Sequence, residues 1–148
     1  MPAATNFLTI FADRRQCFAD LLELSQRQLE LVEKNDYAQL LGLLGGKQQI
    51  IGRLESLGRS RPGLWDDWRS DRNQLAPLAR QACEEVLAQT EALLARLLEH
   101  ERTSTETLAR RRDQTARELR AVAAGGRVNQ AYRDSFAPVT HRHLDRDL

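Results

Sequence analysis

The sequence predicts an all-α protein, an antiparallel three-helix bundle with a long third helix. Leucine, alanine, arginine, glutamate and glutamine dominate its 148 residues, a composition typical of long helices. Apolar residues recur at intervals of three and four along three segments, and glycine, proline and Asn-Asp breaks separate these segments. We therefore expect a bundle over 1–124, with helices at about 5–34, 37–57 and 74–124, and a short helical or disordered tail over 125–148.

The first helix is predicted from a seam in which steps of three and four alternate, as in a coiled coil. The seam consists of Leu8, Phe11, Arg15, Phe18, Leu22, Ser25, Leu29 and Val32. Asn35-Asp36 follows the seam and supplies a break and an N-cap for the next helix. Because this link is so short, the first two helices should form an antiparallel hairpin.

The second helix is predicted from an apolar stripe of Tyr37, Leu40, Leu41, Leu44, Ile51, Leu54 and Leu57. Only Gln48 interrupts the stripe, and Gly42, Gly45 and Gly46 lie in the middle of the helix. These glycines either let the helices approach closely, or let the helix bend, or are simply tolerated on a surface. Gly45-Gly46-Lys47 does not make a phosphate-binding loop, because Leu41 stands at the first glycine position and Gln48 where the hydroxyl should be.

The segment "GRSRPGLWDDW" (58–68) breaks the helical pattern, and we expect Leu64, Trp65 and Trp68 to cover one end of the bundle. The third helix should begin between Asn73 and Pro77, since proline is tolerated in a first turn.

The third helix should end at Ala124, before Gly125-Gly126. Its dense apolar stretch ends at Leu98. At ~1.5 Å per residue, a helix antiparallel to 37–57 should reach the end of the hairpin near residue 97. The last ~25 residues should then project beyond the hairpin, or fold back loosely, and their thin apolar stripe is a candidate surface for a partner helix.

Two apolar groups mark that surface. Leu108, Leu119 and Val122 are the large apolar residues of the third helix after Leu98. In the tail, Val128, Tyr132 and Phe136 recur every four residues, which predicts a short helix ended by Pro138. The final 140–148 segment has no period and is expected to be disordered.

No catalytic constellation, metal site or cofactor motif is predicted. His141 and His143 offer two ligands where a metal needs three or four, and His100-Glu101 lacks the second histidine of a zinc motif. The net charge is +1, although residues 102–148 hold ten arginines against six acidic residues. No apolar run approaches the ~20 residues of a membrane span, so no membrane insertion is expected. Cys17 and Cys83 should be free thiols in a reducing cytoplasm.

The stretch "YAQLLGLLGGKQQIIGRLESL" (37–57), between long flanking helices and followed by "NQAYRDSF" (129–136), resembles the FlgN-type flagellar export chaperones. The resemblance runs from about Leu21 to Tyr132. It implies an all-α cytoplasmic protein without enzymatic activity or nucleic-acid binding. Such a protein binds C-terminal helical segments of hook–filament junction (hook-associated) proteins and delivers them to the type III export apparatus. The matching cargo-binding residues would be Leu108, Leu119, Val122, Val128, Tyr132 and Phe136.

Two other readings remain open at this point. The projecting helix could pair with its own copy, which would make the protein a self-associating structural or signalling coiled coil. The arginine-rich C-terminal part could instead belong to a basic-tailed RNA-binding module, although few aromatic residues accompany the arginines.

Overall fold

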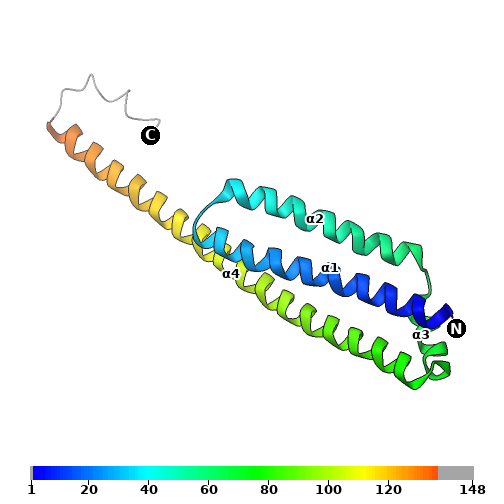
Figure 1. Cartoon of the computed structure of the whole chain (residues 1–148). Helices are drawn as coiled ribbons and strands as arrows, with labels where there is room; N and C mark the ends of the chain where they lie inside the picture. Colours follow the sequence, from blue (N-terminus) through cyan, green and yellow to red (C-terminus); the bar gives the residue numbers. More distant parts are fainter. Residues whose placement is uncertain (1, 137–148) are drawn as a thin grey trace. The chain divides into compact units, whose positions relative to one another are not determined.

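The computed structural model describes residues 2–136, with side chains described for 7–127 and for Gln130. These residues form an all-α protein, as predicted, without a strand among them. The elements are α1 (Pro2–Glu33), α2 (Tyr37–Ser60), α3 (Leu64–Asp71), the 3₁₀ turn η1 (Arg72–Gln74) and α4 (Pro77–Phe136). The chain forms two units, unit 1 ending at Thr105 and unit 2 beginning at Glu106. In unit 1, α1, α2 and the first part of α4 lie side by side (Figure 1).

The predicted hairpin break at Asn35-Asp36 is confirmed. Asn35 has a left-handed φ of 57°, and the N–H groups of Asn35 and Asp36 donate to the carbonyls of Val32 and Leu31 at 3.2 and 3.0 Å. This pair of bonds is a Schellman motif that ends α1. The Asp36 side chain then accepts from the Gln39 N–H at 3.2 Å and caps α2. One dipeptide thus ends one helix and begins the next.

One end of the bundle is closed by an aromatic cluster. Phe7 and Phe11 on α1 meet Trp68 on α3 edge to face, with ring centroids 5.3 and 5.2 Å apart. Leu64 and Trp68 are buried, as predicted, but Trp65 is 43% exposed and stacks on Phe11 from outside. The predicted break therefore contains a helix, α3, which begins after Gly63 at φ 77°. Its turn spacing brings Leu64 and Trp68 to the same face.

The middle of unit 1 holds a second apolar cluster. Its buried members are Cys17, Leu21, Leu22, Ile50 and Leu97. The two free cysteines, Cys17 and Cys83, are buried in separate clusters, and the prediction of free thiols is confirmed.

The predicted inward stripe of α2 is wrong in its first half. Tyr37, Leu41 and Leu44 are exposed, with Leu41 at 72%. The positions that face the bundle step alternately by three and four: Leu40, Leu43, Lys47, Ile50, Leu54 and Leu57. Steps of three and four keep a seam on one side of a helix. One of these inward positions is a lysine, Lys47, and a search for apolar residues alone does not identify it.

The predicted end of the third helix at Ala124 is also wrong, because α4 continues through Gly125-Gly126 to Phe136 over 60 residues. Each glycine costs a helix up to about 1 kcal/mol relative to alanine, and neither forbids helical angles. Within the dense apolar stretch, Leu78 and Leu98 are nevertheless exposed, at 81% and 60%. The packed face extends beyond Leu98 to Ser104, which is fully buried. The apolar stretch ends because the face becomes polar, so the prediction that packing ends near residue 97 is wrong.

Candidate functional site

The structure describes the side chains of three of the six residues predicted to bind cargo. Leu119 and Val122 are 65% and 72% exposed, and Leu108 is half-buried. We call these three residues the α4 stripe. The side chains of Val128, Tyr132 and Phe136 lie outside the described residues, although their backbone belongs to α4.

Because α4 is continuous, the six predicted residues do not share one face. At about 100° per residue, positions 108, 119 and 122 fall within about 60° of one another. Positions 128, 132 and 136 are centred about 110° away from them around the same helix. The expected single surface assumed a break at Gly125-Gly126, and the continuous helix instead places the two sets of positions on different sides.

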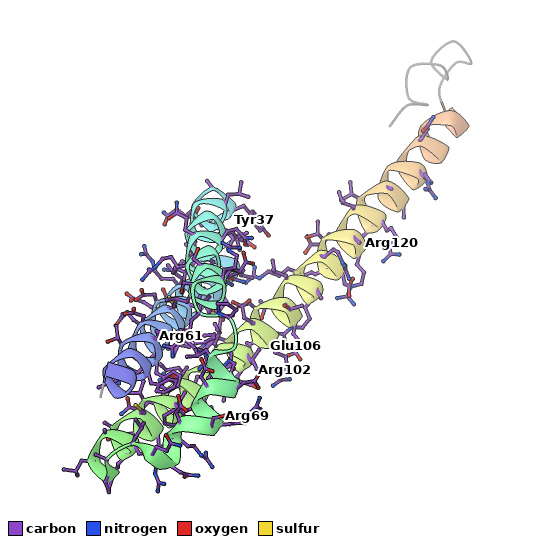
Figure 2. All side chains as sticks on the ribbon, turned by 90° about the vertical axis from the view of Figure 1, so that its right-hand side faces the viewer. Tyr37, Arg61, Arg69, Arg102, Glu106 and Arg120 are labelled. Atoms are coloured by element: carbon purple, nitrogen blue, oxygen red, sulfur yellow. The ribbon has the colours of Figure 1, made fainter. Side chains whose placement is uncertain are left out.

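Arginines surround the α4 stripe. Arg112 lies 3.6 Å from Asp113 in an exposed ion pair, and Arg110 donates to the Thr107 hydroxyl at 3.3 Å. Arg120 is seen on the same part of the helix in Figure 2. The segment 106–127 holds six arginines against three acidic residues, a net charge of +3. The stripe thus presents two exposed apolar side chains, Leu119 and Val122, in a positive setting.

A polar layer crosses unit 1 at the Lys47 position of α2. Lys47 Nζ donates to Gln28 Oε1 of α1 at 2.7 Å and forms a hydrogen-bonded ion pair with Glu101 of α4. The Ser25 hydroxyl donates to the same Glu101 oxygen at 2.5 Å. We call Ser25, Gln28, Lys47 and Glu101 the polar layer. It links all three long helices, and no apolar pattern in the sequence predicted it.

Burial favours the neutral form of Glu101 and would raise its pKa. The hydrogen bonds from Lys47 and Ser25, together with the Lys47 charge, outweigh burial and hold the pKa of Glu101 below its ordinary value. Glu101 is therefore an ionised carboxylate paired with a lysine whose side chain is only 12% exposed. One signal could have pointed to this layer: the chain has two lysines, and one of them interrupts an apolar seam.

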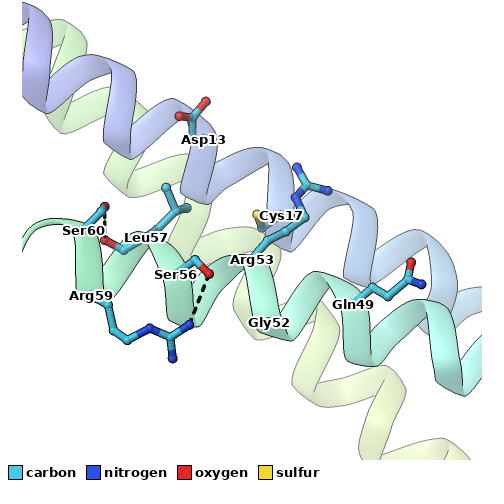
Figure 3. Close-up of a pocket in the computed structure, with 9 residues that line it drawn as sticks. All are labelled: Asp13, Cys17, Gln49, Gly52, Arg53, Ser56, Leu57, Arg59 and Ser60. Atoms are coloured by element: carbon cyan, nitrogen blue, oxygen red, sulfur yellow. Dashed lines mark hydrogen bonds between the residues drawn. The ribbon is translucent and has the colours of Figure 1, made fainter.

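A shallow groove of about 840 Å³ runs between α1 and α2 (Figure 3). Small residues at four-residue intervals, Gly52, Ser56 and Ser60, leave it open on the α2 side. The Cys17 thiol at its base is 1% exposed, and burial raises its pKa, with a smaller lowering by Arg53. A buried thiol with a raised pKa is a poor nucleophile, so Cys17 does not give the groove a reactive thiolate. Burial likewise raises the pKa of Cys83.

Within the described residues, no cluster of three or more His, Cys, Asp or Glu side chains could hold a metal ion. None of the described helices is both long and apolar enough to cross a membrane. Comparison with known proteins adds no relative, since no family model, curated protein or solved structure matches the chain. The candidate site that remains is the exposed α4 stripe.

Proposed function

We propose that the protein is a cytoplasmic export chaperone of the FlgN-like type. It binds C-terminal helical segments of hook-associated proteins and presents them to the type III export apparatus. The observation that carries the proposal is the exposure of Leu119 and Val122, at 65% and 72%, on one face of an uninterrupted helix. The resemblance of the 37–57 and 129–136 stretches to that family supplies the kind of partner.

The geometry of the stripe supports a helical partner. Exposed apolar residues three or four positions apart on a helix are the anchors of helix-in-groove and helix-on-helix recognition. Side chains of leucine and valine gain about 25 cal/mol for each Å² of apolar area removed from water. A stripe of three such residues gives modest affinity, which suits a chaperone that must release its cargo.

Calorimetric titration of a purified hook-associated protein into the full chain tests this proposal. We expect Leu119→Asp to weaken binding by roughly 1–3 kcal/mol, because a charge would be desolvated at the contact. Ala121→Asp is the matched control, since residue 121 is also exposed and lies on the opposite side of the helix. Equal losses in both variants would contradict the stripe as the binding face.

The same samples separate the proposal from its rivals. Sedimentation of the protein alone would show a stable dimer if the stripe pairs with its own copy, and Leu119→Asp would abolish it. A gel shift with RNA that weakens with salt would favour the RNA-binding alternative. Absence of binding to any hook-associated protein, in a folded and monomeric sample, would refute the chaperone proposal.

A further inference from the structure

The α4 stripe belongs to a longer seam with a charge at its centre. Positions 108, 112, 115, 119 and 122 step by four, three, four and three, the spacing of a coiled-coil seam. We call Leu108, Arg112, Thr115, Leu119 and Val122 the α4 seam. A helix laid along Leu108 and Leu119 must also cover Arg112, because that residue lies between them on the same face.

In the free protein Arg112 is held only weakly. Its side chain is 78% exposed, and its ion pair with Asp113 spans 3.6 Å between two exposed neighbours in the chain. Exposed pairs of this kind contribute little to stability, so water and a partner can replace Asp113 easily. The guanidinium therefore remains available to an incoming acceptor.

A partner helix that covers Arg112 removes its charge from water, so the guanidinium then needs a hydrogen-bonding partner of opposite charge. An arginine cannot lose its proton, and a buried charge without a partner is strongly unfavourable. Its planar fork matches a carboxylate with two parallel hydrogen bonds. A partner helix with only apolar residues on its seam would leave this charge unpaired, so the partner must provide a carboxylate opposite position 112.

A second copy of the chain does not meet this requirement. The α4 seam contains no carboxylate, so in either orientation Arg112 would face an apolar side chain, a threonine or another arginine. The segment 106–127 also carries a net charge of +3, which two copies would bring together. Among the described residues, Arg117 and Arg120 form no ion pair that would reduce this repulsion. An acidic helix gains from the same charges.

We infer that the α4 seam selects an amphipathic helix of net negative charge, with a carboxylate placed on its apolar face opposite Arg112. This inference rests on the proposed function, in which the seam binds a partner helix, and adds the chemistry that the partner must have. Leu108, Leu119 and Val122 supply apolar contact, and Arg112 sets the partner's register and identity.

Binding of three designed helical peptides of about 25 residues to the full chain tests this. All three have leucine at their seam positions and glutamates on their flanks, and they differ at one central seam position, which is Glu, Gln or Lys. We expect the Glu peptide to bind at least about tenfold more tightly than the Gln peptide. Arg112→Glu should remove this preference and favour the Lys peptide instead. Equal affinity of the Glu and Gln peptides would overturn the inference.

Arg117→Glu is the matched control, because it changes the net charge by the same amount on the opposite side of the helix. It should leave the ratio of Glu-peptide to Gln-peptide affinity unchanged. If Arg112→Glu and Arg117→Glu weaken the Glu peptide equally, general charge rather than seam contact is responsible, and the inference fails. The inference also fails if single-stranded RNA displaces the peptide and both variants reduce RNA binding alike.

Two outcomes separate this inference from the proposed function. If a hook-associated protein binds and Arg112→Glu has no effect on it or on the peptides, the seam carboxylate is refuted while the chaperone proposal stands. If the Glu peptide binds in an Arg112-dependent manner and no hook-associated protein does, the chaperone proposal is refuted and the inference stands for another acidic helix.

Discussion

The polar layer predicts a large loss of stability when Lys47 is replaced by methionine. Methionine keeps most of the aliphatic length of lysine and removes the ammonium group. The substitution deletes the hydrogen-bonded ion pair to Glu101 and the 2.7 Å hydrogen bond to Gln28. The loss should therefore report the polar contacts rather than packing.

The magnitude follows from how well water can replace each contact. The Glu101 side chain is 34% exposed, so water recovers part of its loss, and the low end of the about 1.5–3 kcal/mol for a charged hydrogen bond applies. Gln28 is 6% exposed, and its acceptor oxygen loses this bond in a buried site, which costs about 1–3 kcal/mol. We expect about 3 kcal/mol in total, from a typical stability of about 5–15 kcal/mol. At about 2–4 °C per kcal/mol, the melting temperature should fall by about 6–12 °C.

Urea and thermal unfolding followed by far-UV circular dichroism measure this loss. Lys34→Met is the control, because Lys34 is the only other lysine and is exposed, so its loss should stay within about 0.5 kcal/mol. The double variant Lys47→Met/Glu101→Leu should recover part of the loss, since no unpaired charge then remains in the layer, although Gln28 still lacks its hydrogen bond. The reasoning is refuted if Lys47→Met costs no more than Lys34→Met, or if the double variant is no more stable than the single one.

Three further predictions concern unit 1. Gly45→Ala should raise the free energy of unfolding by up to about 1 kcal/mol, because an added Cβ meets nothing within 4 Å. Gly63→Ala should lower the free energy of unfolding by about 1–2 kcal/mol, because the φ of Gly63 is 77°. Urea titrations that give both changes the same sign would contradict this. Trp68→Ala should lower the free energy of unfolding by about 3–5 kcal/mol and Trp65→Ala by only about 1–2 kcal/mol, since Trp68 is 5% exposed and Trp65 is 43% exposed. Calorimetric melting in which Trp65→Ala is the more destabilising variant would contradict the described closure of the bundle by Trp68. The folded pKa of Glu101 is depressed, so its stabilising contribution is present above its unfolded pKa and is lost as the pH falls through the folded pKa. The difference in unfolding free energy between the wild type and Glu101→Gln should therefore shrink below pH 4.5, the ordinary pKa of a glutamate. A difference that does not change from neutrality to about pH 3 would exclude the ion pair as the source of this stabilisation.

Gly42, Gly45 and Gly46 bear on the question that the sequence left open. An added Cβ at Gly42 or Gly45 would meet nothing within 4 Å, and one at Gly46 would lie 3.6 Å from Leu24, an ordinary contact. The hypothesis that these glycines allow close helix approach is therefore wrong. The residue after these glycines, Lys47, faces inward and belongs to the polar layer.

The sequence by itself determined the helical class, the hairpin and its break at Asn35-Asp36, and the start of α4 within residues 73–77. These features depend on signals that lie within a few residues of where they act, such as an N-cap, a left-handed asparagine, a proline in a first turn and apolar periodicity. The exposed positions of the α4 stripe were also readable, because residues 119 and 122 stand in a segment with few apolar neighbours.

Only the tertiary structure decided which face of α2 is inward, that Lys47 pairs with Glu101 across 54 positions of the chain, and that Trp65 remains outside while Trp68 is buried. Periodicity could not rank two stripes on α2 that both contain leucines, since the choice depends on what the neighbouring helices present. The continuity of α4 through Gly125-Gly126 was missed for a related reason. Two glycines cost a helix about 2 kcal/mol relative to alanine and do not forbid helical angles. Whether the helix breaks there depends on the stability of the rest of the helix, which the glycines themselves do not indicate.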